Sequence, residues 1–174
     1  MVNTDCPIRV AAWDAHAHNK LNQAEQLYRQ LLREQQPVDL RDAINLGALL
    51  RHQGRLNEAL EHYDQWIPSF PNGLHLRLNG INAALDLRNS ERACRWVSEG
   101  LQQWPDDPQL KHLHAKTLAA QGRLDEAQAQ LEQLTQSSIA GAAGIWLDLG
   151  LIRHQRRALE DSLAAFDQAA ALNP

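Results

Sequence analysis

Apolar residues recur every three or four positions along nearly the whole chain, and the period-two alternation of half-buried strands is absent. Short segments carrying glycine, asparagine or proline interrupt the pattern at regular intervals. The pattern therefore predicts an all-α protein built from consecutive helical pairs. The expected pairs are 6–18 with 22–35, 40–52 with 56–69, 74–86 with 90–103, 108–120 with 124–136, and 143–155 with 159–171.

The predicted second helices repeat one another at a nearly fixed interval. Equivalent small residues lie 35, 34, 34 and 35 residues apart, and a bulky apolar residue follows each of them four positions later. Self-similarity at this period indicates a stacked array whose units are held by their neighbours. The small residues are Ala24, Ala59, Ala93, Ala127 and Ser162. We expect a single array over 1–174, with units at about 5–39, 40–73, 74–107, 108–142 and 143–174.

Small residues also occur in the first helix of most pairs. Two antiparallel helices need small side chains where they approach closely, and larger residues fill the space on either side. This predicts four crossing points, at Ala12 with Ala24, Gly47 with Ala59, Ala115 with Ala127, and Gly150 with Ser162.

The turns inside the pairs carry a second repeated signal. Gly54 and Gly122 each begin a Gly-Arg-Leu-x-Glu-Ala segment, and glycine reaches positive φ at low cost after a helix. Asn19 stands at the equivalent place in the first unit and tolerates the same conformation. Arg88 and Arg157 tolerate it poorly, so a different turn geometry is expected there.

These motifs together resemble the tetratricopeptide repeat. The resemblance rests on Trp146-x-x-Leu149-Gly150, the Gly-x-Leu-x-Glu-Ala turns, Phe166-x-x-Ala169 and the closing Pro174, and it covers about residues 5 to 174. It implies a right-handed α-solenoid of five antiparallel helix pairs. It also implies that the first helix of each pair lines a concave groove that binds other proteins.

Some positions depart from this repeat pattern. Gly80-Ile81 reverses the large-then-small order, and Gly100 interrupts a second helix, so the third unit is expected to be the least regular. Residues 137–142 form a longer connection that is expected to act as a hinge. The chain stops at Pro174 without a polar capping helix, which favours a fragment of a longer protein or an end buried against another copy.

The composition limits the expected partners and the expected cellular compartment. A formal net charge of -4 gives no reason to expect nucleic acid as a partner, and no apolar stretch is long enough to span a membrane. The two cysteines, Cys6 and Cys94, fall in different predicted units, so a reducing cytoplasm is expected. The style of the repeats, rich in Gln, Leu and Ala, is typical of a bacterial protein.

The sequence contains few motifs that indicate metal binding or catalysis. The chain has eight histidines, but no HExxH and no cysteine-pair spacing, so no metal site is expected. No nucleophile elbow, phosphate-binding loop or dinucleotide fingerprint occurs. We therefore expect neither enzymatic activity nor a cofactor.

The groove implied by the resemblance supplies the candidate binding residues. Its fixed cations outnumber the acids Asp86 and Asp148, so it is expected to be more basic than the chain as a whole. Asn45 and Asn79 are 34 residues apart and are expected to form two rungs that bind a peptide backbone. The predicted partner-binding residues are Arg9, Trp13, Arg41, Asn45, Arg51, His52, His75, Asn79, Asn82, His112 and Lys116.

The resulting hypothesis is a protein-interaction scaffold that binds an extended peptide or a partner domain, with an acidic or C-terminal peptide favoured by the cations. The asparagine pair resembles part of the asparagine ladder of some repeat proteins, and more weakly the carboxylate clamp of chaperone-binding members. Two alternatives remain open. In the first alternative, the array is the N-terminal recruiting arm of a larger bacterial enzyme, such as a glycosyltransferase or methyltransferase. In the second, it self-associates through the uncapped C-terminal repeat.

Overall fold

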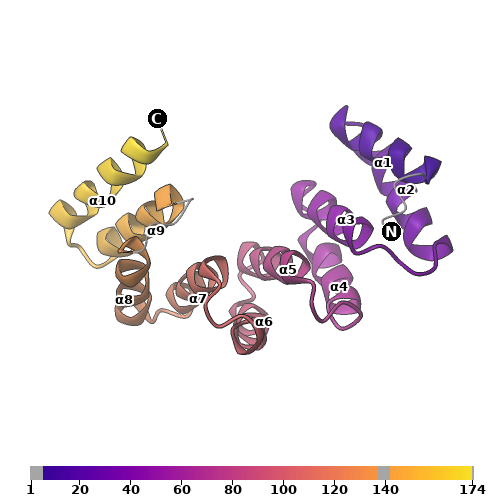
Figure 1. Ribbon diagram of the computed structural model, residues 1–174. Coiled ribbons are helices and arrows are strands. Elements are labelled where there is room, and N and C mark those ends of the chain that lie inside the picture. The colour runs from indigo at the N-terminus through magenta and orange to yellow at the C-terminus, as the bar shows by residue number, and fades with distance from the viewer. Residues whose placement is uncertain (1–5, 137–141, 174) are drawn as a thin grey trace. The chain divides into compact units, whose positions relative to one another are not determined.

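The computed structural model describes residues 6–136 and 142–173, which contain ten α-helices and no strand. The chain is coloured from indigo at the N-terminus to yellow at the C-terminus (Figure 1). The predicted all-α class is confirmed, and most helix ends fall within two residues of the predicted ones. The helices are α1 (Pro7–Ala17), α2 (Leu21–Glu34), α3 (Leu40–His52), α4 (Leu56–Trp66), α5 (Leu74–Asp86), α6 (Ser90–Gln103), α7 (Pro108–Ala120), α8 (Leu124–Thr135), α9 (Ala142–Gln155) and α10 (Leu159–Leu172).

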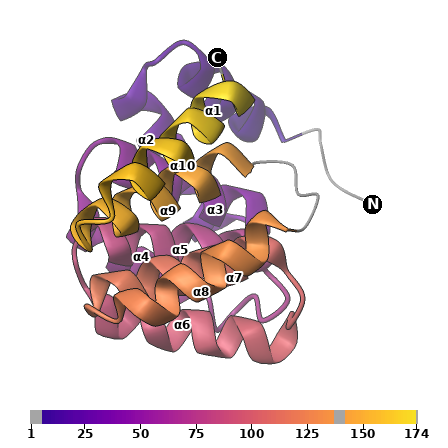
Figure 2. The same ribbon diagram turned by 90° about the vertical axis from the view of Figure 1, so that its left-hand side faces the viewer.

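The chain divides into two compact units, Met1–Ala83 and Ala84–Pro174, and the boundary falls inside α5. In the first unit α1 packs against α2, α2 against α3, and α3 against α4. In the second unit each of the helices from α6 to α10 packs against its successor, and α7 also contacts α9. Helices α9 and α10 lie side by side in both views (Figures 1 and 2).

The two glycines predicted at helix crossings make room for aromatic rings. A methyl group added to Gly47 would lie 2.5 Å from Cζ of Tyr63, and one added to Gly150 would lie 2.5 Å from Cε1 of Phe166. The hydroxyl of Ser162 donates to the carbonyl of Gly150 at 3.0 Å, which confirms the close approach of α9 and α10. Glycine is therefore required here because a ring from the second helix fills the space of a side chain.

The buried side chains come from both helices of each pair. Ala24, Tyr28 and Leu31 of α2 are at most 1% exposed, and so are Leu49 and Leu50 of α3. The second unit has its own cluster, in which α7 to α10 contribute Ala115, Leu118, Ala127, Leu131, Leu134, Ile145, Leu149, Ile152 and Ala165. Each large aliphatic side chain buried in this way contributes about 1.5–3 kcal/mol relative to exposure. The stacking of successive repeats thus supplies the stability that one pair lacks.

The expectation of a different turn at Arg88 and Arg157 is wrong. Their φ angles are 57° and 64°, in the same left-handed region as Gly54 at 74° and Gly122 at 80°. The hydrogen-bond pattern is also shared, because Arg55 N bonds Leu50 O at 3.0 Å and Ala158 N bonds Arg153 O at 3.0 Å. The packing of helix pairs fixes this turn, and the arginines accept a conformation that costs about 1–2 kcal/mol.

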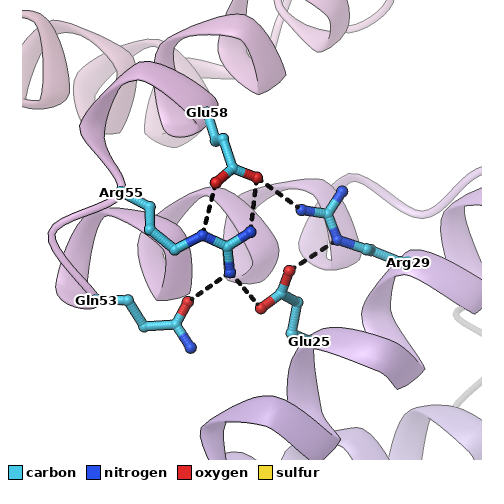
Figure 3. A network of polar contacts seen from close by, with 5 residues as sticks. All are labelled: Glu25, Arg29, Gln53, Arg55 and Glu58. Carbon is cyan, nitrogen blue, oxygen red and sulfur yellow. Dashed lines mark hydrogen bonds and ion pairs between the residues drawn. The ribbon is translucent and has the colours of Figure 1, made fainter.

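A polar network joins the first repeat to the second (Figure 3). Arg55 donates to both oxygens of Glu58, at 2.7 and 2.6 Å, and to Glu25 at 2.6 Å. Arg29 closes the ring through Glu25 at 2.9 Å and Glu58 at 3.4 Å. Burial alone would raise the pKa of Glu25, but the hydrogen bonds from Arg55 and Arg29 outweigh it and lower that pKa.

Two other irregularities were predicted, a break at Gly100 and a hinge at 137–142, and the structure describes the first of them. Helix α6 runs from Ser90 to Gln103 without a break, and Gly100 is buried inside it. The connection predicted as a hinge lies outside the described residues, apart from Ala142 at the start of α9.

Candidate functional site

In each unit, the first helices of neighbouring repeats form a shared surface, because side chains of one first helix reach the next. We call the surface of α1 and α3 the α1/α3 face, and the surface of α7 and α9 the α7/α9 face. Side chains bridge the two helices on each face. Arg9 of α1 reaches Asp42 of α3, and His112 of α7 reaches Asp148 of α9. Most of the predicted binding residues lie on these helices.

Arg9 is not an open binding residue, which corrects the expectation from the sequence. Its side chain is 4% exposed and Asp42 is 1% exposed. The guanidinium donates from Nε to Oδ1 of Asp42 at 3.0 Å and from Nη2 to Oδ2 at 2.7 Å. Such a two-point pair holds both groups in fixed orientation. Arg9 therefore connects the first two repeats, and a partner cannot reach it.

Trp13 and Arg41 form a platform on the α1/α3 face. The Arg41 guanidinium carbon lies 5.4 Å from the centroid of the Trp13 ring, a cation–π contact. Asp39 accepts from Arg41 Nε at 3.1 Å and Nη2 at 2.7 Å, and it also caps α3 through the Arg41 backbone N–H. These hydrogen bonds lower the pKa of Asp39 against the effect of burial. Both Trp13 and Arg41 keep part of their surface exposed.

The predicted asparagines are half-buried, and two of them already have intramolecular hydrogen bonds. Asn45 hydrogen-bonds the hydroxyl of Tyr28, which also lies 3.3 Å from His16 Nδ1. Burial raises the pKa of Tyr28 to about 12, Asp42 adds to the rise, and the Asn45 bond opposes it. Asn82 donates to the carbonyl of Leu78 at 3.0 Å within α5. Asn79 is half-buried on the same helix.

The remaining predicted residues of the first unit lie near helix ends. Arg51 is half-buried and His52 is exposed, both in the last turn of α3. His75 is exposed in the first turn of α5. Arg51 and His52 therefore lie at the opposite end of α3 from Arg41, whereas His75 has the same place in α5 that Arg41 has in α3.

The charge balance of the α1/α3 face differs from the sequence count. That count included Arg9 and Arg41 but left out Asp39 and Asp42, which pair with them. Two cations and two anions thus stand together, and the excess of positive charge disappears at this place. The sequence could have indicated the role of Asp39, because an aspartate directly before a predicted helix is a favoured N-cap. No local sequence pattern indicates the role of Asp42, since its burial depends on the neighbouring repeat.

The α7/α9 face brings His112 and Lys116 together with Asp148. His112 Nε2 lies 2.7 Å from Asp148 Oδ2, and Lys116 Nζ lies 3.8 Å from the same oxygen. Leu147 and Leu151 flank Asp148 and are 48% and 52% exposed. This face therefore offers apolar surface beside a partly neutralised polar cluster.

The described residues contain neither a metal site nor a membrane span. Over residues 6–136 and 142–173, no group of three His, Cys, Asp or Glu side chains could hold a metal ion. Cys6 and Cys94 are both free thiols. None of the described helices has the length and apolar character needed to cross a membrane.

Tandem two-helix units with left-handed turns and small residues at the crossings define a helical-repeat protein. The family model described as the tetratricopeptide repeat matches residues 9–73 and 112–174. The chain belongs to the tetratricopeptide-repeat family. No curated protein matches the chain.

Solved structures with the same fold are distant in sequence. MamA (residues 41 to the end) from Desulfovibrio magneticus RS-1 is 13% identical, with a TM-score of 0.78 over 95% of this chain and 92% of that one. The thermophilic TPR protein TTC0263 of Thermus thermophilus is 21% identical, with a TM-score of 0.77 over 97% of this chain and 90% of that one. At these identities the likeness establishes the fold alone.

Proposed function

We propose that the chain is a protein-interaction scaffold that binds an extended peptide or a partner domain on its first-helix faces. The observation that supports this most is the Trp13–Arg41 platform. Tryptophan and arginine are the side chains most often found to dominate binding energy at protein interfaces. Here Asp39 already holds the arginine, so little side-chain freedom remains to be lost on binding.

The platform suits a partner residue that stacks or packs on a flat surface. The guanidinium carbon of Arg41 lies over the Trp13 ring, and two guanidinium nitrogens donate to Asp39. The exposed parts of the ring and the guanidinium then offer apolar contact together with unused N–H donors. An apolar or aromatic partner residue beside a backbone carbonyl would satisfy both.

The acidic-partner form of this proposal has less support on the α1/α3 face, where the charges of Arg9 and Arg41 are balanced. On the α7/α9 face, Lys116 and His112 share the single carboxylate of Asp148. A partner acid would therefore gain more there than on the platform. Peptides that differ only in charge separate these two modes of recognition.

The test is a peptide-library selection against the intact chain, followed by titration of the selected peptides. Trp13→Ala should weaken binding by about tenfold or more if the platform is a hot spot. Asn45→Ala combined with Asn79→Ala should also weaken it without loss of helicity. Gln26→Ala, an exposed change on α2, is the matched control. Unchanged affinity in Trp13→Ala would remove the platform from the proposal.

A second candidate function is self-association through α10. Leu159 and Leu163 are 58% and 63% exposed, whereas Leu60, at the place equivalent to Leu163 in the second repeat, is 3% exposed. Exposed apolar patches of this kind mark interaction surfaces. Sedimentation at increasing concentration should show a dimer that Leu163→Gln weakens and Asp167→Asn leaves unchanged. A wild-type chain that stays monomeric to high concentration would exclude this candidate.

A further inference from the structure

A cleft of about 430 Å³ opens in the second unit between α6, α7 and α8. This volume lies within the range of about 300–1,000 Å³ that small-ligand sites occupy. The lining includes residues of two second helices, so the cleft is separate from the α7/α9 face. It is lined by Leu101, Pro105, Lys111, His114, Gln130, Gln133 and Leu134.

The polar wall of the cleft presents a hydrogen-bond donor. Gln130 Nε2 lies 2.9 Å from His114 Nδ1, so with this amide orientation Nδ1 is the acceptor. The proton of the neutral ring then resides on Nε2. Burial, with Arg123 nearby, lowers the pKa of His114 and favours this neutral form. Within the described part of the chain, Nε2 has no hydrogen-bond partner.

A cation stands beside this donor. Lys111 Nζ pairs with Asp106 Oδ1 at 3.0 Å, and the Asp106 side chain is 96% exposed. An ion pair this exposed contributes little stability and is readily exchanged for another carboxylate. His114 and Lys111 together can therefore bind an acidic group, while Leu101, Pro105 and Leu134 offer apolar surface next to it.

The first unit contains a smaller version of the same cleft, of about 240 Å³. When the second and fourth repeats are aligned at Ala59 and Ala127, Leu46 is equivalent to His114 of the larger cleft. In the same alignment His62 is equivalent to Gln130. His62 lies 2.7 Å from the carbonyl of Ala43 through Nε2, so its proton is already used. Equivalent helix positions therefore line a cleft in both units. The ring N–H that remains available to a ligand is that of His114 in the larger cleft.

We propose that the larger cleft binds the C-terminal residue of a partner protein. The terminal carboxylate accepts from His114 Nε2 and pairs with Lys111, and an apolar terminal side chain packs on Leu101 and Leu134. Gln133, exposed at the rim, is placed to hydrogen-bond the preceding peptide group. The lining combines the apolar side chains of Leu101, Pro105 and Leu134 with four polar ones, which suits a peptide end that carries both an apolar side chain and a carboxylate. This site lies outside the first-helix faces and goes beyond the proposed function.

The test titrates the ¹⁵N-labelled chain with a hexapeptide ending in leucine, as the free acid and as the C-terminal amide. The free acid should shift the signals of Leu101, His114 and Leu134, and the amide should bind about tenfold more weakly because a charge-assisted bond is lost. His114→Leu, which copies Leu46, and Lys111→Gln should each weaken the acid by about tenfold. Asp106→Asn should strengthen it, because a competing carboxylate is removed. His18→Gln, an exposed change far from the cleft in sequence, is the control.

Each other outcome overturns the proposal. Equal affinity for acid and amide would show that the carboxylate is not recognised. Binding of octanoate but not of the peptide would identify a site for small carboxylic acids. Shifts confined to the first-helix faces would support the proposed function and reject this site, and no shift at millimolar peptide would reject it outright. Lys111→Gln keeps the test decisive if His114→Leu disturbs folding, because Lys111 is a surface residue.

Discussion

Arg55 Nη1 lies 2.6 Å from Glu25 Oε2, so the residue preceding α4 is tied to α2 of the repeat before it. The Glu25 side chain is 13% exposed, and Arg55 also holds Glu58 of its own helix. The later copy of this turn, Arg123 with Glu126, keeps the local pair at 2.6 Å. In place of Glu25, however, it has Cys94. The same turn sequence therefore makes an inter-repeat connection in one unit and a local pair in the other.

Glu25→Gln should lower the unfolding free energy of the first unit by about 0.5–1 kcal/mol, since a partly buried pair is lost from a network. The loss should shrink in 1 M salt, where charges are screened. Urea denaturation at low and high salt measures both effects. Glu126→Gln is the matched control and should cost less, because Arg123 and Glu126 are exposed and belong to one turn. Equal losses in the two variants would contradict an inter-repeat role for Glu25.

Gly47→Ala should destabilise the first unit by about 1–3 kcal/mol, because the new methyl group would meet the Tyr63 ring at 2.5 Å. Tyr63→Leu should remove most of this cost, since the fourth repeat pairs Ala115 with Leu131 at the same places. A double-mutant cycle measured by urea denaturation gives the coupling.

Gly54→Ala provides the control for that cycle. Gly54 has φ of +74° and nothing within 4 Å of an added Cβ, so its cost is backbone strain of about 1–2 kcal/mol. Tyr63→Leu should leave this cost unchanged. Additive effects of Gly47→Ala and Tyr63→Leu would show that the ring does not set the need for glycine.

The sequence predicted features that depend on local pattern. Apolar spacing located the helices, and small residues such as Gly47 and Gly150 located the crossings, because both signals lie within one repeat. Gly54 and Gly122 marked their turns for the same reason. Residue preference alone failed at Arg157, where the packing of the two helices imposes a turn that arginine does not favour.

The binding faces were predicted less well, since they depend on contacts between repeats. Arg9 was counted as an open cation, but Asp42 lies 33 positions later and only the packing of the first repeat on the second brings the two together. The pairing of His112 with Asp148 likewise spans 36 positions. The cleft around His114 was missed altogether, because it forms between helices whose relative placement no single repeat encodes.

Arg157→Gly should stabilise the second unit by about 0.5–1 kcal/mol. The residue has φ of 64°, where glycine avoids a cost of about 1–2 kcal/mol but gains freedom in the unfolded chain. Thermal unfolding followed by circular dichroism should show a higher midpoint. Gly122→Arg is the reciprocal change at φ of 80° and should lower the midpoint. A fall in both variants would mean that Arg157 makes a contact that outweighs its backbone cost.

Stability should fall between pH 7.5 and pH 5 partly because of His62. Its side chain is 8% exposed, and burial lowers its pKa below the ordinary value of 6.5 even though the hydrogen bond to Ala43 opposes the shift. The unfolded chain therefore binds the proton more readily, so the stabilisation is complete above about pH 6.5 and is lost as the pH falls below it. His114 shifts in the same direction. The lowered pKa of Glu25 affects stability only when the pH falls below the ordinary pKa of 4.5, which is outside this window.

His62→Gln tests this assignment, because Gln130 occupies the equivalent place in the fourth repeat and an amide can also donate to Ala43. The variant should lose less unfolding free energy than the wild type between pH 7.5 and 5, by about 1.4 kcal/mol for each unit of pKa shift. Urea denaturation at four or five pH values measures the difference. His52→Gln, an exposed change in α3, should follow the wild-type curve. Parallel curves for wild type and His62→Gln would place the pH dependence at His114 instead.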